Sequence, residues 1–141
     1  MAAKRLAELG VDVLLVEKRP EVGMPVRCGE ATGMKGLRDL GIEVRKGLVA
    51  AETRGSHLYS PNGTEVVLAS PEPNGYILER RLFDKHLAVL AAKAGAEVRV
   101  RTYATGLLKE GGIVKGVRLK HFSEEYDLQC RCVVGADGIE G

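Results

Sequence analysis

The spacing of apolar residues predicts short helices and strands in alternation. Residues 1–9 carry apolar side chains at helical spacing, and Gly10 follows as a helix stop. Residues 11–16 are then almost continuously apolar, which indicates a strand buried on both faces, as in a parallel sheet covered by helices. Residues 80–94 give the clearest helical pattern of the chain, and residues 97–102 predict the next strand. The pattern therefore indicates an α/β fold class.

The remaining apolar segments indicate an antiparallel layer added to this α/β unit. Further strands are predicted within residues 56–68 (a hairpin around Pro61-Asn62-Gly63), 107–119 (a hairpin around Gly111-Gly112), 126–130 and 132–134. The last of these is expected to be buried and to lead into a turn at Ala136-Asp137-Gly138. Residues 18–36 have no period and predict a long loop, and residues 37–54 fit a short helix followed by a strand.

Composition narrows the class of protein. The chain has 141 residues, enough for one ordinary domain or part of a larger one, and its net charge of +2 argues against a nucleic-acid-binding protein. No window approaches the ~18 apolar residues of a membrane span, and the start lacks the layout of a signal peptide. Three cysteines make no disulfide framework, so a reducing cytoplasm is expected. Cys130 and Cys132 are predicted to lie in the core, and no metal site is predicted.

The first seventeen residues match the second half of a dinucleotide-binding βαβ unit. In such a unit the second strand ends in an acid that binds the ribose hydroxyls, and Glu17 stands at that position. An acid that merely ends a strand in solvent is the plainer interpretation. The first strand and its Gly-rich phosphate turn would precede Met1, and a further part would follow residue 141. We therefore expect residues 1–141 to be a partial, central segment of a longer domain.

Three further features could contact a nucleotide or a redox ring. The Arg27 guanidinium offers planar donors to a phosphate or a flavin, and Cys28 is either a soft group near such a ring or a small buried hydrophobe. Arg80 begins the strongest helix, where its charge opposes the helix dipole unless an anionic ligand or Asp84 offsets it. Asp137 could accept hydrogen bonds from ligand hydroxyls, or simply form a turn.

These features occur in an order that resembles one family of flavoproteins. The chain resembles the geranylgeranyl reductase family, built like p-hydroxybenzoate hydroxylase, and above all the archaeal digeranylgeranylglycerophospholipid reductases. The segments that carry the resemblance are Glu17–Gly23, Pro25–Glu30, Gly75–Arg80, Phe83–Leu87, Ala91–Ala96 and Ala136–Gly138.

The resemblance implies a partial Rossmann-like FAD-binding domain of the p-hydroxybenzoate hydroxylase type, with FAD as cofactor. It implies an enzyme that saturates isoprenoid double bonds of membrane lipids by hydride transfer from the flavin. Glu17 would bind the adenosine ribose, Ala104 would lie by the adenine, and Asp137 would touch the ribityl–phosphate part. Cys28 would be the catalytic candidate, for tuning the ring or delivering a proton. The implied FAD-binding residues are Glu17, Lys18, Arg27, Cys28, Gly29, Arg80, Ala104, Asp137 and Gly138.

The implied partners are an isoprenoid lipid and an electron donor, which the sequence leaves open between a ferredoxin, a nicotinamide and a deazaflavin. A cytoplasmic location is expected, with peripheral contact with the membrane left open. Two alternatives also stay open: an aromatic hydroxylase using NAD(P)H and oxygen, and a truncated, non-catalytic fragment. Because the Gly-rich turn would lie upstream, the isolated segment is expected to be inactive and to hold FAD weakly.

Overall fold

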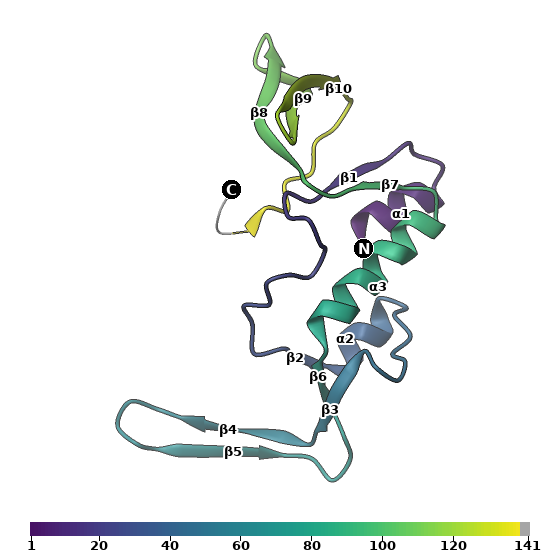
Figure 1. Ribbon diagram of the computed structural model, residues 1–141. Coiled ribbons are helices and arrows are strands. Elements are labelled where there is room, and N and C mark those ends of the chain that lie inside the picture. Colours follow the sequence, from purple (N-terminus) through teal and green to yellow (C-terminus); the bar gives the residue numbers. More distant parts are fainter. Residues whose placement is uncertain (139–141) are drawn as a thin grey trace. The chain divides into compact units, whose positions relative to one another are not determined.

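The computed structural model describes residues 1–138 and divides the chain into two compact units. Unit 1 comprises residues 1–22 and the segment from residue 90 onward, and unit 2 comprises residues 23–89. The boundary at residue 90 falls within helix α3 (Arg80–Lys93), which Figure 1 shows as the longest helix. Each unit has its own buried apolar side chains, and each is described separately below.

Unit 1 begins with helix α1 (Ala2–Glu8) and strand β1 (Leu14–Val16), which pairs in parallel with β7 (Glu97–Arg99). The expected helix, glycine stop and parallel pairing are confirmed: Gly10 has a φ of +77° and donates to the Ala7 carbonyl at 2.9 Å. Both strands are shorter than predicted. After β7 the chain turns at Arg101, which has a φ of +54°, and enters the next strand at Thr102.

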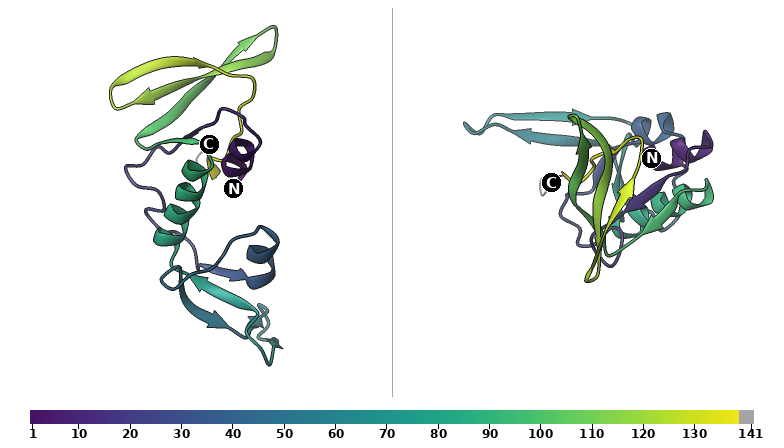
Figure 2. Two further views of the ribbon diagram at one scale, coloured as in Figure 1. Left: turned by 90° about the vertical axis from the view of Figure 1, so that its right-hand side faces the viewer. Right: turned by 90° about the horizontal axis from the view of Figure 1, so that it is seen from above.

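The predicted antiparallel layer is a sheet of β8 (Thr102–Glu110), β9 (Ile113–His121) and β10 (Glu124–Gln129), with β9 in the centre (Figure 2). The expected glycine turn joins β8 to β9. Val117 and Leu119 are buried on one face of β9, and Arg118 points to the other, where its Nε donates to Asp127 at 2.7 Å. This alternation is what a sheet with one covered face requires.

The expected buried strand at residues 132–134 is wrong. The structure assigns no strand there, and Val133 and Val134 are 37% and 63% exposed. Strands need a hydrogen-bonded partner, and none of the strands in the described part of the chain pairs with this segment. The core positions expected for Cys130 and Cys132 are wrong for the same reason: β10 ends before them, so Cys130 is half-buried and Cys132 exposed.

Unit 2 is built on a three-stranded antiparallel sheet, in which β6 (Gly75–Leu78) lies between β2 (Ala31–Gly33) and β3 (Val49–Thr53). Helix α2 (Met34–Asp39) follows β2. Its buried apolar side chains are Leu37, Ile42, Leu78 and Phe83. The predicted loop at residues 18–36 thus contains β2 and the start of α2, because a strand of three residues is too short to show a period.

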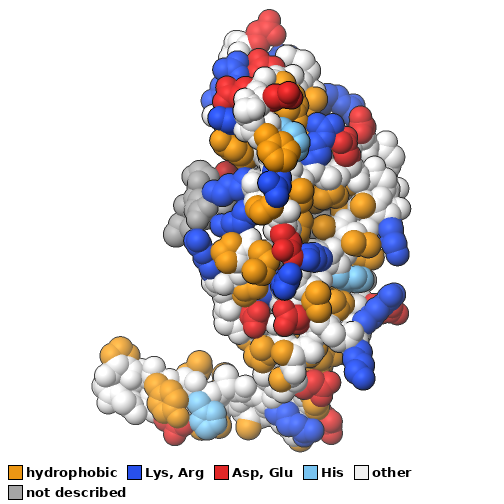
Figure 3. All heavy atoms as spheres, in the orientation of Figure 1, with side chains coloured by type: hydrophobic (Ala, Val, Ile, Leu, Met, Phe, Trp, Pro, Cys, Tyr) orange, Lys and Arg blue, Asp and Glu red, His pale blue; other side chains and the backbone are white. Residues whose placement is uncertain are grey.

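The predicted hairpin at residues 56–68 is confirmed as β4 (Gly55–Tyr59) paired with β5 (Glu65–Ala69), visible in Figures 1 and 2 as a long two-stranded ribbon. One of its faces is aliphatic, with Leu58, Val66 and Leu68 each about half exposed. In Figure 3 the hairpin shows apolar side chains beside a histidine and an acidic side chain. The opposite face carries a polar cluster that includes Glu65.

Helix α3 begins where the Glu79 carbonyl accepts the amides of Leu82 and Phe83, at 3.0 and 2.8 Å. It ends before Gly95, whose φ is +108°, as the sequence predicts. Within residues 1–138, no helix combines the length and the apolar character that crossing a membrane would need.

Candidate functional site

Glu17 lies directly after β1 and is held by hydrogen bonds on both sides. Its amide donates to the Arg99 carbonyl at 2.9 Å, and its carbonyl accepts the Thr102 amide at 3.0 Å. Its carboxylate Oε1 accepts the Arg19 amide at 2.8 Å, and the residue is half-buried. The carboxylate is therefore fixed at the carboxyl end of a strand in a parallel pair, the position at which open α/β sheets bind ligands.

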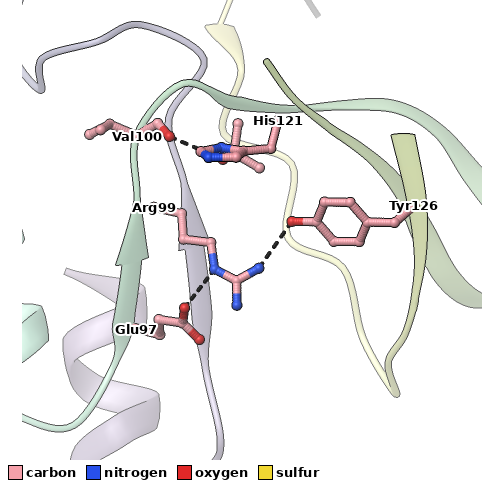
Figure 4. Close-up of polar contacts among 6 residues, drawn as sticks. Glu97, Arg99, Val100, His121 and Tyr126 are labelled. Atoms are coloured by element: carbon pink, nitrogen blue, oxygen red, sulfur yellow. Dashed lines mark hydrogen bonds and ion pairs between the residues drawn. The ribbon is translucent and has the colours of Figure 1, made fainter. Parts of the chain in front are cut away.

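The segment after β7 lies against this turn. The Arg101 amide donates to the Arg19 carbonyl at 3.0 Å, which places Arg101 beside the chain that carries Glu17. Thr102 is completely buried; its hydroxyl donates to the Val100 carbonyl at 3.0 Å and lies 2.8 Å from Nδ1 of His121 (Figure 4). The start of β8 is thus anchored to both β1 and β9.

Ala104 lies two residues further along β8, opposite Leu119 of β9, and is exposed. The register of the β8–β9 pair shifts between Ala104 and Gly106. Such irregularities re-aim backbone groups and are common beside binding sites. The backbone around Ala104 is therefore accessible, as the predicted adenine contact requires.

A second polar group ties β7 to β10 (Figure 4). The Arg99 guanidinium donates to Glu97 at 2.5 Å and to the Tyr126 hydroxyl at 3.0 Å. The hydrogen bonds that Arg99 donates to Glu97 and then to Tyr126 raise the pKa of Arg99 above its ordinary value, so the group stays a cation. These bonds hold the antiparallel sheet on the strand that pairs with β1.

In unit 2, strand pairing brings Cys28 next to Arg80 although 52 positions separate them in the sequence. Ala31 of β2 pairs with Ile77 of β6, and the Glu30 carbonyl accepts the Leu78 amide at 3.0 Å. The Glu30 amide in turn donates to the Cys28 sulfur at 3.3 Å. Cys28 is exposed, so the alternative of a buried hydrophobe is wrong.

Asp84 supplies the offset that Arg80 requires at the start of α3. Nε and Nη2 of Arg80 donate to the two Asp84 oxygens at 3.0 and 2.9 Å, a bidentate pair across one helical turn. The hydrogen bonds that Arg80 donates to Asp84 raise the pKa of Arg80, burial opposes this, and Cys28 adds smaller contributions in the same direction as Asp84. The guanidinium is thus held in one orientation between a carboxylate and a sulfur.

Gly23 allows the loop before Cys28 to approach α3. Its φ is +83°, and a Cβ built on it would lie 3.0 Å from the Arg81 carbonyl oxygen and 3.2 Å from that of Arg80. Only glycine fits this position without displacing the backbone. Sequence reasoning did not assign this role to Gly23, although a glycine beside a proline-containing loop was the available signal. Sequence reasoning also missed the contact between Thr102 and His121, because a single sequence carries no signal for it.

The remaining predicted FAD-binding residues lie mostly at the surface. Lys18, Arg27 and Gly29 are exposed, and so is Asp137, whose Oδ1 lies near Gly135. Gly138 has a φ of +68°, which suits a tight turn. The structure brings Cys28 to Arg80 within unit 2, and Glu17 to the start of β8 within unit 1. Because these groups belong to separately described units, a common ligand for Glu17, Arg80 and Asp137 stays a prediction.

The residues present fit a dinucleotide that carries a redox ring. Unit 1 offers a fixed carboxylate for ribose hydroxyls, and unit 2 offers a fixed guanidinium beside a thiol. Among residues 1–138, no group of three or more His, Cys, Asp and Glu side chains is arranged to hold a metal ion. The fold and these groups define a dinucleotide-binding α/β protein.

Comparison with protein families agrees with this class. The FAD binding domain family matches residues 1–141, and the chain therefore belongs to the FAD-binding domain family. This membership confirms the expected α/β fold class and FAD as the cofactor.

Curated relatives confirm the resemblance to geranylgeranyl reductases. The chain is 50% identical over 143 residues to the digeranylgeranylglycerophospholipid reductase of Methanosarcina acetivorans, and 42% identical to that of Thermoplasma acidophilum. Both alignments cover 99% of this chain and, respectively, 35% and 36% of the relative. The chain thus spans about a third of the length of these curated relatives.

Solved structures agree in fold. A geranylgeranyl bacteriochlorophyll reductase-like protein from Thermoplasma acidophilum superposes with a TM-score of 0.91 at 43% identity, over 99% of this chain and 36% of that one. A flavin-dependent brominase gives a TM-score of 0.76 at 23% identity over 98% of this chain and 35% of its own, which is evidence of a shared fold alone.

Proposed function

We propose that this chain forms part of an FAD-dependent reductase that saturates the isoprenoid double bonds of membrane lipids. The observation that carries the proposal is the likeness of nearly the whole chain to reductases named for digeranylgeranylglycerophospholipid, at up to 50% identity. The arrangement of Cys28, Arg80 and Asp84 also supports the proposal, because it places a thiol that can donate a proton beside a fixed cation.

In this proposal FAD in its reduced form supplies the hydride that is added to one alkene carbon. The residues that would hold it are Glu17, Lys18, Arg27, Cys28, Gly29, Arg80, Ala104, Asp137 and Gly138. Glu17 would accept hydrogen bonds from the ribose hydroxyls, and Arg80 would lie along the cofactor as a fixed cation.

Cys28 is the proposed donor of the proton that the second alkene carbon needs. The Cys28 sulfur accepts the Glu30 amide at 3.3 Å and lies beside the Arg80 guanidinium, so the thiol is held in place as a candidate donor. Addition of the hydride to one alkene carbon and of the proton to the other gives the saturated product. The two electrons that restore the flavin come from a separate donor: a ferredoxin, a nicotinamide or a deazaflavin.

The substrate proposed is the isoprenoid chain of a lipid, met at the membrane surface from the cytoplasm. In this proposal contact with the lipid surface is peripheral.

The proposal can be tested in a chimera. The matching segment of the Methanosarcina acetivorans reductase is replaced by this chain, the flavin is reduced chemically, and a geranylgeranyl lipid is supplied. We expect the lipid to gain mass in steps of two hydrogens, and Cys28→Ser to slow this at least tenfold while FAD remains bound. An unchanged lipid mass beside an active, unmodified relative would contradict the proposal. Oxygen consumption with hydroxylation of an aromatic would favour the hydroxylase instead.

A further inference from the structure

Two bulky residues of unit 1 adopt left-handed backbone conformations and contact each other. Arg101 has a φ of +54° and Phe122 a φ of +52°, and the Arg101 Cζ lies 5.3 Å from the centre of the Phe122 ring. This conformation is unfavourable for a bulky side chain, and Gly or Asn would normally occupy it. Strained residues that persist in this way cluster at ligand-binding positions.

Phe122 is also an unusual residue for its surroundings. It lies in the two-residue turn between β9 and β10, where Asn-Gly or Asp-Gly pairs are favoured, and 62% of its surface is exposed. An exposed aromatic ring at a strained turn position contributes little to a core. Its ring is therefore available to hold another planar group.

A chain of contacts fixes the ring from the buried side. The Thr102 hydroxyl uses its one proton on the Val100 carbonyl, so Nδ1 of His121 must be the donor in the 2.8 Å contact with that oxygen. The imidazole of His121 then packs edge-on against Phe122, with 4.6 Å between ring centres and 80° between planes. Thr102, completely buried, thus positions the ring, and the ring positions the Arg101 guanidinium.

The backbone places this pair beside the proposed ribose-binding acid. The Arg101 amide donates to the Arg19 carbonyl, and the next amide, that of Thr102, donates to the Glu17 carbonyl. These two backbone bonds hold the segment that carries Arg101 against the turn that carries Glu17. Arg101 is exposed, and a guanidinium held over an aromatic ring offers a flat cationic surface on which a purine stacks.

We propose that Arg101 and Phe122 form a stacking platform for the adenine base of the dinucleotide. The platform would add affinity and orientation at the adenosine end, whichever substrate the flavin reduces. The inference rests on membership of the FAD-binding domain family and on Glu17, and not on the proposed reductase activity.

The test measures binding of adenosine 5′-monophosphate to the FAD-free chimera by isothermal titration calorimetry. The key variants are Arg101→Gly and Phe122→Gly, because glycine relieves the left-handed strain while it removes the stacking group. We expect melting temperatures at or above that of the unsubstituted chimera, together with a fivefold to tenfold loss of affinity at about 1–1.4 kcal/mol for such a stack. Arg118→Ala, an exposed arginine on the same sheet, is the matched control and should retain affinity within about twofold.

Ribose 5-phosphate, which lacks the base, distinguishes stacking from general electrostatics: Arg101→Gly should leave its affinity unchanged. The proposal is overturned if Arg101→Gly binds the nucleotide normally, if both ligands weaken equally, or if the unsubstituted chimera binds no nucleotide. Glu17→Ala in the same titration separates the two ideas. Loss of binding in Glu17→Ala but not in Arg101→Gly would refute the platform and leave the ribose site intact.

Discussion

Gly23 shows how one residue controls the approach of the Cys28 loop to α3. At Gly23 two factors exclude a side chain: the positive φ, and carbonyl oxygens that would lie 3.0 and 3.2 Å from an added Cβ. Gly10 has a similar φ of +77° but has open space where a Cβ would be added. The two glycines therefore separate conformational strain from steric exclusion.

We expect Gly23→Ala to lower the free energy of unfolding by about 2–3 kcal/mol, since strain and overpacking add. Gly10→Ala should cost only about 1 kcal/mol, the strain alone. Urea denaturation of both variants measures the difference. Equal losses would show that the loop does not pack against the start of α3 as described.

Asp84 fixes the Arg80 guanidinium, so we expect replacement of Asp84 to change the candidate cofactor site. Asp84→Asn keeps the shape but removes the charge from a bidentate pair whose side chains are 34% and 24% exposed. We expect a loss of about 1–2 kcal/mol in the free energy of unfolding, as for hydrogen bonds to charged groups. In the chimera, FAD affinity should fall as well.

Lys35 and Asp39 form the control pair, because they are also four residues apart on a helix but are 85% and 57% exposed. Asp39→Asn should change stability by under about 0.5 kcal/mol and leave FAD affinity unchanged. If Asp84→Asn proves equally silent, then Asp84 does not position Arg80.

At the scale of elements, the β4–β5 hairpin is held on its polar face by one carboxylate. Oε1 of Glu65 lies 2.6 Å from Nδ1 of His57 and accepts the Tyr59 hydroxyl at 2.7 Å. The hydrogen bond from His57, then that from Tyr59, lowers the pKa of Glu65, and Glu65 raises the pKa of Tyr59.

The sign of the pH dependence follows from this lowered pKa. Because the folded pKa of Glu65 lies below its unfolded value, its contribution to stability is present above the unfolded pKa and is lost as the pH falls through the folded one. NMR titration of the Glu65 carboxyl should show a midpoint below 4.5. In a His57→Phe, Tyr59→Phe double variant the midpoint should return toward 4.5. A midpoint unaffected by the double variant would rule out these contacts in solution.

Elements with a strong local signal could be predicted from the sequence, and those made by distant pairing could not. Helix α3 and the β4–β5 hairpin follow from periodicity and turn residues within their own segments. Strand β2 owes its existence to β6, more than 40 positions away, and residues 132–134 are apolar like a strand yet have no partner in the described chain. Periodicity reports burial within a segment and carries no information about the partner strand.

The candidate site likewise has a part that could be predicted from the sequence and a part that could not. Glu17 could be predicted because an acid that ends the second strand of a βαβ unit has a fixed topological place. The contact of Cys28 with Arg80, and the anchoring of Phe122 through Thr102 and His121, depend on strand register. Register is set by tertiary pairing, so neither arrangement is visible along one sequence.

At the scale of the whole molecule, each of the two units carries its own candidate cofactor-binding group. Unit 1 carries the fixed carboxylate of Glu17, and unit 2 carries Arg80 with Cys28. The chain belongs to the FAD-binding domain family, and the proposal to be tested is that Glu17 and Arg80 each contribute to its affinity for FAD.

The most direct test is the affinity of the chimera for FAD, measured by equilibrium dialysis with Glu17→Gln, Arg80→Gln and the control Arg118→Gln. The account predicts about one FAD per chain for the unsubstituted chimera. Each site substitution should weaken binding at least tenfold, about 1.4 kcal/mol, and the control should not. Stoichiometric FAD that binds with unchanged affinity when Glu17 and Arg80 are both replaced would contradict the account.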